Sequence, residues 1–334
     1  MHWMIHLRFL SGPDIDELEI GPDDAIAAVE SVVAAHGRGE TVFEPRTHLV
    51  PDNGGVGHFN LLRAHVKGLG VAGVKVVGDF VPNYRHGLPS ELAMVTLLDP
   101  YTGVPMSIMD ATWITEMRTG AMTAVGAKYL ARPDSRVLGH VGARGTAFAN
   151  ITLLDRLFPL EEIRVTSRRA ESREAFGVRL REVTDTPVRV VETADEVFDG
   201  ADILVEASRL TEPQPLLRTS LVRPGAFVVP YGTVSAVELD LLDVMDKVVV
   251  DDWRESRSGR FGALRAHVDT GRLSEETLYA QLGEIVSGQK PGRESSTERI
   301  LFWHRGLSIL DVALAHLILK RAEAADAGTM LRYR

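Results

Sequence analysis

The pattern of apolar and polar residues divides the chain into two kinds of segment. Before residue 110, short runs with strand character follow one another, separated by turns rich in glycine, asparagine and proline. One early helix is expected to begin at Pro22 and to end near Gly37. The expected strands are 5–10, 41–50, 58–66, 71–78, 92–98 and 105–108. Strands joined by short turns predict a mostly antiparallel sheet.

From residue 110 the pattern changes to an alternation of helices and strands. A long helix is expected over 110–131, and the apolar runs that follow are short and continuous, as in strands buried on both faces. The expected strands are 136–141, 163–166, 188–191, 203–206, 226–229 and 248–250, and the helices between them are 146–157, 172–182 and 194–198. This alternation predicts a Rossmann-type doubly wound parallel sheet.

The end of the chain, 301–325, has apolar residues at helical spacing and is predicted to be one helix. We expect it to pack on the first part of the chain, which makes that α+β domain discontinuous. A length of 334 residues also favours two domains. The predicted fold class is α/β, with one domain at 1–118 and 304–334 and the Rossmann domain at 119–303.

Composition excludes several classes of function. The formal net charge of −9 argues against binding to nucleic acid or to an anionic membrane. The absence of cysteine excludes disulfides, thiolate metal sites and a cysteine nucleophile, and it suits a cytoplasmic protein. The N-terminal apolar run is too short for a signal peptide, and we expect no membrane span. The histidines lack metal-ligand spacing, so no metal site is predicted.

A glycine turn between a predicted strand and a predicted helix is a candidate cradle for the phosphates of a dinucleotide. The first glycine would form the tight turn, and the last small residue would let the helix approach the sheet. The candidate cofactor-binding residues are Gly142, Ala143, Arg144, Gly145, Thr146 and Ala147. Arg144 stands where the second glycine of such motifs belongs, although its guanidinium could itself bind phosphate. An ordinary strand-to-helix turn would show a similar pattern.

The second strand of this unit is followed by Ser167, Arg168 and Arg169. An acidic residue there would bind a ribose hydroxyl, whereas arginine accommodates a 2′-phosphate, so we expect NADP(H) to be favoured over NAD(H). The alternative is that both arginines are solvated charges beside Glu171.

Three cations in the first half of the chain are candidates for a carboxylate site. Arg46 lies on a predicted strand, Lys75 is flanked by apolar residues, and Arg118 lies in the N-terminal half of the long helix. A buried cation needs a partner, and a substrate carboxylate supplies one, with bidentate geometry for arginine. Surface charges and internal salt bridges remain the alternatives, and Asp251 with Asp252 is either a metal pair or a turn at a strand end.

Together these pieces resemble the ornithine cyclodeaminase/mu-crystallin family over nearly the whole chain. The resemblance rests on an ordered set of motifs: EPRT (44–47), GVKVV (73–77), PN (82–83), GLP (87–89), DPYTG (99–103), MRTGA (117–121), AKYLARP (127–133), VGA (141–143), RPGA (223–226), ELD (238–240), VD (250–251), Gly306 and Asp311. It implies a homodimer with an N-terminal substrate-binding and dimerisation domain, an NAD(P)-binding Rossmann domain and an amino acid or imino acid substrate. It also implies that Arg46, Lys75 and Arg118 bind this substrate.

The sequence departs from this family at three places. The cyclodeaminases carry an aspartate after the fifth Rossmann strand, and Thr233 stands nearest its place here. Thr146 replaces a glutamine of the phosphate turn, and His304 replaces a lysine near the last helix. The missing aspartate argues against ornithine cyclisation.

We therefore expect an NADP(H)-dependent oxidoreductase that acts on the C–N bond of a small amino acid or its cyclic imine. Arg46 and Arg118 would fix the carboxylate, and Lys75 would orient the substrate and serve as the catalytic group in proton transfer. Two alternatives are an ornithine cyclodeaminase, which recycles bound NAD, and a ligand-binding protein without activity.

Overall fold

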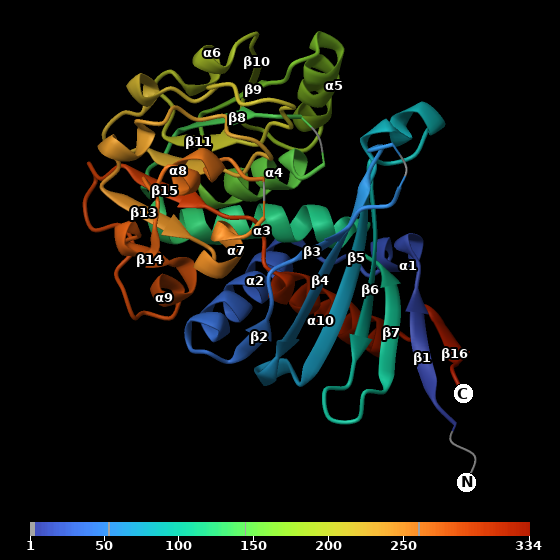
Figure 1. Cartoon of the computed structure of the whole chain (residues 1–334). Helices are drawn as coiled ribbons and strands as arrows, with labels where there is room; N and C mark the ends of the chain where they lie inside the picture. Colours follow the sequence, from blue (N-terminus) through green and yellow to red (C-terminus); the bar gives the residue numbers. More distant parts are fainter. Residues whose placement is uncertain (1–3, 53, 144, 260) are drawn as a thin grey trace. The chain divides into compact units, whose positions relative to one another are not determined.

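The computed structural model describes residues 4–52, 54–143, 145–259 and 261–334. The chain forms two compact units, Met1–Arg118 with Gly306–Arg334, and Thr119–Arg305. Each unit is built around a sheet of its own (Figure 1). The molecule thus has the mixed α/β class predicted from the sequence. No helix within the described residues combines the length and the apolar character that crossing a bilayer requires.

The sheet of the first unit is mostly antiparallel. Its spatial order is β16-β1-β7-β6-β5-β4-β2, with β3 paired to β4, and only β1 and β7 are parallel neighbours along this path. The strands are β1 (His6–Leu10), β2 (Thr41–Phe43), β3 (Thr47–Leu49), β4 (His58–Val66), β5 (Val71–Asp79), β6 (Glu91–Leu98), β7 (Pro105–Asp110) and β16 (Thr329–Arg332). The predicted strand at 41–50 is two short strands, β2 and β3.

One face of this sheet is covered by helices. Helix α10 (Ser308–Ala325) contacts β4, β5, β6 and helix α2 (Pro22–Gly37), and in Figure 1 it lies behind the strands. Alternate residues of β5 are buried, and Gly73 is one of them. A Cβ on Gly73 would lie 2.9 Å from Val312 of α10, so glycine is what admits the helix at this distance. The unit also contains α1 (Gly12–Asp16), η1 (Lys67–Leu69), η2 (Val81–His86) and the start of α3 (Thr112–Leu130).

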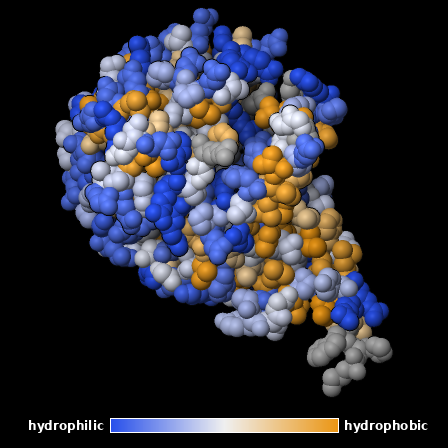
Figure 2. Space-filling view, viewed as in Figure 1, coloured by the Kyte–Doolittle hydropathy of each residue, from blue (hydrophilic) through white to orange (hydrophobic). Residues whose placement is uncertain are grey.

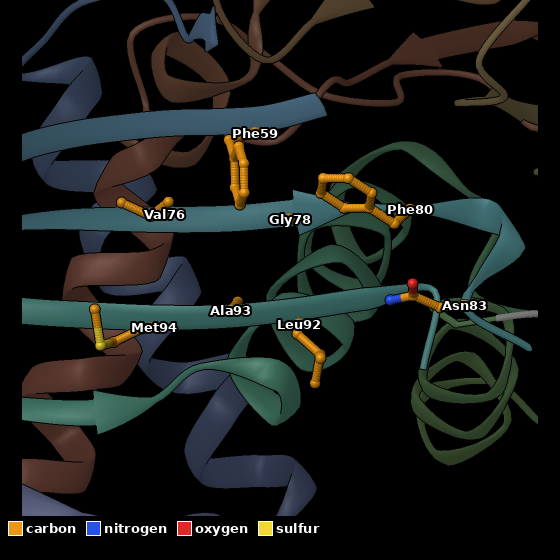
Figure 3. Close-up of a pocket in the computed structure, with 8 residues that line it drawn as sticks. All are labelled: Phe59, Val76, Gly78, Phe80, Asn83, Leu92, Ala93 and Met94. Atoms are coloured by element: carbon orange, nitrogen blue, oxygen red, sulfur yellow. The ribbon is translucent and has the colours of Figure 1, made fainter. Parts of the chain in front are cut away.

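The opposite face of the same sheet carries apolar side chains that remain partly exposed. Figure 2 shows hydrophobic side chains gathered over these strands. Phe59, Val76, Leu92 and Met94 line a shallow hollow of about 430 Å³ on this face (Figure 3). The Phe59 ring meets that of Phe80 edge to face, with 5.3 Å between the centroids. A face of this composition is typical of an interaction surface.

The sheet of the second unit is entirely parallel, as the continuous apolar runs predict. Its order is β10-β9-β8-β11-β12-β15-β13-β14, and the first five positions have the Rossmann order 3-2-1-4-5. The strands are β8 (Val137–Val141), β9 (Glu162–Thr166), β10 (Val188–Val190), β11 (Ile203–Glu206), β12 (Phe227–Pro230), β13 (Lys247–Val250), β14 (Ala280–Gln281) and β15 (Ile300–Trp303). The helical elements are α4 (Ala147–Leu157), α5 (Ala170–Arg181), α6 (Ala194–Phe198), α7 (Trp253–Arg257), α8 (Arg265–Asp269), α9 (Leu282–Val286), η3 (Thr219–Leu221), η4 (Leu241–Val244) and η5 (Glu275–Thr277).

The prediction of a single helix over 301–325 is wrong at its beginning. Ile300–Trp303 forms the buried strand β15 between β12 and β13, and the helix begins only at Ser308. Gly306, with φ +81°, separates the two elements. A short apolar run is compatible with a buried strand or with a buried helix, so periodicity alone could not separate them.

Candidate functional site

Lys75 is the centre of the first group of candidate residues. It lies on β5 and points toward the helix-covered face, where 1% of it is exposed. Its Nζ donates to Thr115 Oγ1 of α3 at 3.2 Å and forms an ion pair with the carboxylate of Asp311 in the first turn of α10. The alternation of β5 and the missing side chain of Gly73 together bring the lysine to the helix that carries its partner.

Arg118 reaches the same carboxylate from α3. Its Nε lies 3.3 Å from Asp311 Oδ1, the oxygen that also accepts from Lys75. Arg118 is 7% exposed. Its guanidinium passes over Gly306, where a Cβ would lie 1.4 Å from Nη1 and would overlap it. Gly306 therefore makes the space that this arginine occupies.

Arg46 completes the group from the segment between β2 and β3. Its Nη2 donates to the carbonyl oxygen of Gly306 at 2.9 Å, and the residue is half-buried. The structure thus places all three predicted cations within the first unit. Arg46 and Arg118 lie at Gly306, and Lys75 and Arg118 lie at Asp311.

The electrostatics of this cationic cluster, defined as Arg46, Lys75, Arg118 and Asp311, favour an added anion. Burial lowers the pKa of Lys75 to about 8; Asp311 opposes this shift, and Arg118 and Arg46 add to it. The cluster has three basic groups and one carboxylate, and Asp311 Oδ2 has no hydrogen-bond partner among the described residues. A bound carboxylate would reduce the excess of positive charge.

The second group of candidates lies at the carboxyl edge of the parallel sheet. Gly142 follows β8 with φ +117°, and a Cβ there would lie 2.7 Å from the carbonyl oxygen of Ala207. Its N–H donates to Thr166 O at 2.9 Å. The turn then passes through Gly145, with φ +45°, into α4. This geometry suits a phosphate-binding turn, in which backbone and a helix N-terminus face the anion. Arg144 lies outside the described residues.

Thr146 contacts a residue that follows β12 at the same edge of the sheet. Its Oγ1 is 3.0 Å from the hydroxyl of Tyr231, which follows β12 and also accepts from Asn150 Nδ2 at 3.1 Å. Tyr231 stacks on His304 with 5.1 Å between the ring centroids. These contacts fix the beginning of α4 against the end of β12, which positions the glycine turn.

The remaining cofactor candidates lie at the ends of β9 and β12. Ser167 is half-buried, whereas Arg168 and Arg169 are exposed directly after β9. Thr233 is half-buried after β12, and its N–H donates to Ser208 O at 3.2 Å. Because β8, β9 and β12 are parallel, their carboxyl ends and the candidates that follow them share one edge.

Sequence reasoning gave no role to several residues that the structure brings to these places. Gly306 and Asp311 entered it only as motifs of the family resemblance. Asp311 had a usable signal, because it is the one charged residue in the mostly apolar segment 307–315. Gly306 and Tyr231 had no local signal for these contacts, since the contacts come from distant segments. Glu206, at the end of β11, is fully buried; burial raises its pKa to about 7, and Ser208 N donates to its Oε1 at 2.7 Å.

Asp251 and Asp252, a candidate metal pair in the sequence, have structural hydrogen bonds. Asp251 accepts from the Arg305 N–H at 2.8 Å and from Ser256 Oγ at 3.2 Å. Asp252 is the N-cap of α7 and accepts from the Arg254 N–H at 2.8 Å. Within the described residues there is no group of three potential metal ligands.

Comparison with known proteins identifies relatives along the whole chain. Alanine dehydrogenase of Archaeoglobus fulgidus is 29% identical over 327 residues, which cover 97% of this chain and 98% of the relative. The structure of Δ1-pyrroline-2-carboxylate reductase of Thermococcus litoralis in complex with NADH and L-proline matches with a TM-score of 0.90 and 29% identity, covering 97% and 99% of the two chains. An archaeal alanine dehydrogenase dimer with bound NAD matches with a TM-score of 0.90 and 28% identity, covering 99% and 100%.

A sequence model of the ornithine cyclodeaminase/mu-crystallin family matches residues 10–326. The match begins at the last residue of β1 and ends just after α10, so it spans most of the first unit, the whole of the second and all the candidate residues. The resemblance predicted from the ordered motifs is confirmed: the chain belongs to the ornithine cyclodeaminase/mu-crystallin family.

Proposed function

We propose that the protein is an NAD(P)H-dependent oxidoreductase acting on the C–N bond of a small amino acid or its cyclic imine. The observation that carries this proposal is the cationic cluster. Buried Lys75 and Arg118 share the Asp311 carboxylate, and Arg46 lies with Arg118 at Gly306. Such a cluster suits the carboxylate of an amino or imino acid. The relatives named alanine dehydrogenase and pyrroline-2-carboxylate reductase act on molecules of this class.

In this proposal Arg118 and Arg46 bind the substrate carboxylate, because a guanidinium matches a carboxylate with two parallel hydrogen bonds. Among the described residues Lys75 Nζ donates to Thr115 and Asp311, which leaves one of its three N–H groups for the substrate. Reduction of an imine adds a hydride to carbon and a proton to nitrogen. Lys75 holds that proton, because a pKa near 8 suits proton transfer close to neutral pH.

The dinucleotide fits the glycine turn of the second unit. Gly142 has no room for a Cβ, and backbone amides at the beginning of α4 are available to phosphate. The residues that would hold the cofactor are Gly142, Ala143, Gly145, Thr146, Ala147, Ser167, Arg168, Arg169 and Thr233. When bound, the nicotinamide supplies the hydride.

We propose a preference for NADP(H), and this proposal rests on Arg168 and Arg169 alone. The two structural relatives give it no support, because they contain NADH and NAD. Both side chains are exposed after β9, where a 2′-phosphate would be bound. The Arg168→Ala/Arg169→Ala variant should weaken NADPH binding at least tenfold and leave NADH binding nearly unchanged, as measured by protein fluorescence titration. Equal effects on both cofactors would contradict the preference.

We also propose a homodimer formed through the open face of the first sheet. Apolar side chains on this face are partly exposed, among them Leu92 at 44% and Met94 at 50%. A second copy of the chain would cover them, and the archaeal alanine dehydrogenase relative is described as a dimer. The cytoplasmic location stays a prediction from the cysteine-free composition.

The activity is tested with NADPH and NADH against a panel of cyclic imino acids, and in reverse with alanine, proline and other small amino acids. We expect the absorbance of the reduced cofactor to decrease with at least one imino acid. Arg118→Met should raise KM for that substrate roughly ten- to a hundredfold, because a charge-assisted hydrogen-bond pair is lost. Absence of turnover with every substrate in both directions would contradict the proposal.

The same assay separates the alternatives. Production of proline and ammonia from ornithine without net change of the cofactor would identify a cyclodeaminase. Thr233 in place of the cyclodeaminase aspartate makes this outcome unexpected. Calorimetry that detects binding of neither dinucleotide would favour a ligand-binding protein without activity.

A further inference from the structure

We infer that Asp311 is a positioning residue, which holds Arg118 in its substrate-binding orientation and keeps Lys75 charged inside the protein. This inference rests on the proposed function, because it assigns a role within the proposed carboxylate site. Asp311 itself would not need to touch the substrate.

The geometry places one oxygen between two cations. Asp311 Oδ1 accepts from Lys75 Nζ and lies 3.3 Å from Arg118 Nε. The exposed fractions of the three side chains are 1% for Asp311, 1% for Lys75 and 9% for Arg118. A carboxylate shared in this way fixes the distance between the lysine and the arginine.

Two glycines make this arrangement possible. Gly73 lets α10 approach β5, so that Asp311 reaches a lysine two residues further along the strand. Gly306 leaves room for the Arg118 guanidinium two residues before α10 begins. The approach of α10 to β5 therefore depends on the missing side chain of Gly73. The orientation of Arg118 depends on the missing side chain of Gly306.

The charges that face Lys75 explain why a negative partner is required. Arg118 acts on it from α3 and Arg46 from the segment between β2 and β3, and both oppose its protonation. Thr115 on α3 contributes a neutral hydroxyl, which accepts from Lys75 and donates to Ala111 O at 2.8 Å. Asp311 on α10 is the group that favours the charged lysine. Its removal would leave three basic groups together.

The direct test measures the titration of Lys75 itself. The experiment is NMR of protein in which the lysines are labelled with carbon-13. The spectrum has few signals, because the chain has six lysines: Lys67, Lys75, Lys128, Lys247, Lys290 and Lys320. The Lys75→Arg variant identifies the signal of Lys75. In the wild type this signal should titrate near pH 8, and Asp311→Asn should move the midpoint down by about one to three pH units.

The control for loss of any buried aspartate is Asp202→Asn. Asp202 is 2% exposed and is paired with Arg132 and Arg223 in the second unit. This variant should lower thermal stability without moving the Lys75 signal. An unchanged Lys75 midpoint in Asp311→Asn, or an equal shift in Asp202→Asn, would overturn the inference.

Kinetics test the orientation of Arg118. Asp311→Glu keeps the charge but moves it by one methylene, so Lys75 should titrate as in the wild type while KM rises at least fivefold. This variant also decides the matter if Asp311→Asn does not fold, since a wild-type KM in Asp311→Glu would contradict the positioning role. In each variant that is active, the pKa that Lys75 contributes to the kcat/KM pH profile should shift in the same direction as the titration midpoint of the Lys75 signal.

A carboxylate probe separates failure of this inference from failure of the proposed function. Pyrrole-2-carboxylate, a planar analogue of a cyclic imino acid, should raise the Lys75 midpoint in the wild type, because it adds a negative charge to the cluster. A wild type that neither binds this probe nor turns over any imino acid refutes the proposed function. The effect of Asp311→Asn on the free protein still tests the role of Asp311.

Discussion

Single residues without side chains determine whether the cationic cluster can form. Gly306 combines φ +81° with a position where a Cβ would overlap Arg118 Nη1. We expect Gly306→Ala to displace Arg118, to raise KM for the carboxylate substrate roughly tenfold or more, and to lower stability by about 1–3 kcal/mol. Steady-state kinetics and urea unfolding measure the two effects.

The matched control is Gly103→Ala. Gly103 has φ +72°, but apart from its chain neighbours no described residue has an atom within 4 Å of its Cβ position. This change therefore introduces the backbone strain without the overlap. It should lower stability by a similar amount and leave KM unchanged. A wild-type KM in Gly306→Ala would show that Arg118 does not bind the substrate in the orientation seen here.

At the scale of the element, the end of β11 carries a buried acid that makes stability depend on pH. Burial raises the pKa of Glu206 from 4.5 in the unfolded chain to about 7, so the folded protein binds this proton more tightly. The contribution of Glu206 to the free energy of unfolding is therefore complete below about pH 4.5, and it is lost as pH rises through 7. As pH rises from 4.5 to 8, the free energy of unfolding of Glu206→Gln should increase by about 3 kcal/mol relative to that of the wild type. Denaturant unfolding of both proteins measures this difference. Parallel stability profiles of the two proteins would contradict this assignment.

At the scale of the whole molecule, the open face of the first sheet predicts that two copies of the chain form a dimer. Met94→Asp places a charge at a half-exposed position on β6, so the folded unit should tolerate it while the dimer interface does not. Light scattering should detect a monomer. Val178→Asp, at a position 55% exposed on α5 of the second unit, is the control and should remain dimeric. A dimeric Met94→Asp protein would place the interface elsewhere.

The sequence determined the features that depend on local pattern. Continuous apolar runs predicted the parallel strands of the second unit, because a strand covered on both faces has no polar positions to alternate. Turn residues marked the hairpins of the first sheet. Lys75 stood out as a cation flanked by apolar residues, and Arg118 as the arginine in the N-terminal half of the long helix. The glycine turn at 142–147 was found because strand, turn and helix follow one another in the chain.

Only the tertiary structure decided which distant residues meet. Strand β15 could not be distinguished from a helix, because its apolar run has no period and its place is between strands from an earlier part of the chain. Asp311 became the partner of Lys75 through the contact of α10 with β5, which are more than two hundred residues apart. A charge pattern along the chain identifies candidate cations, but the partner of a buried cation is set by packing across the fold.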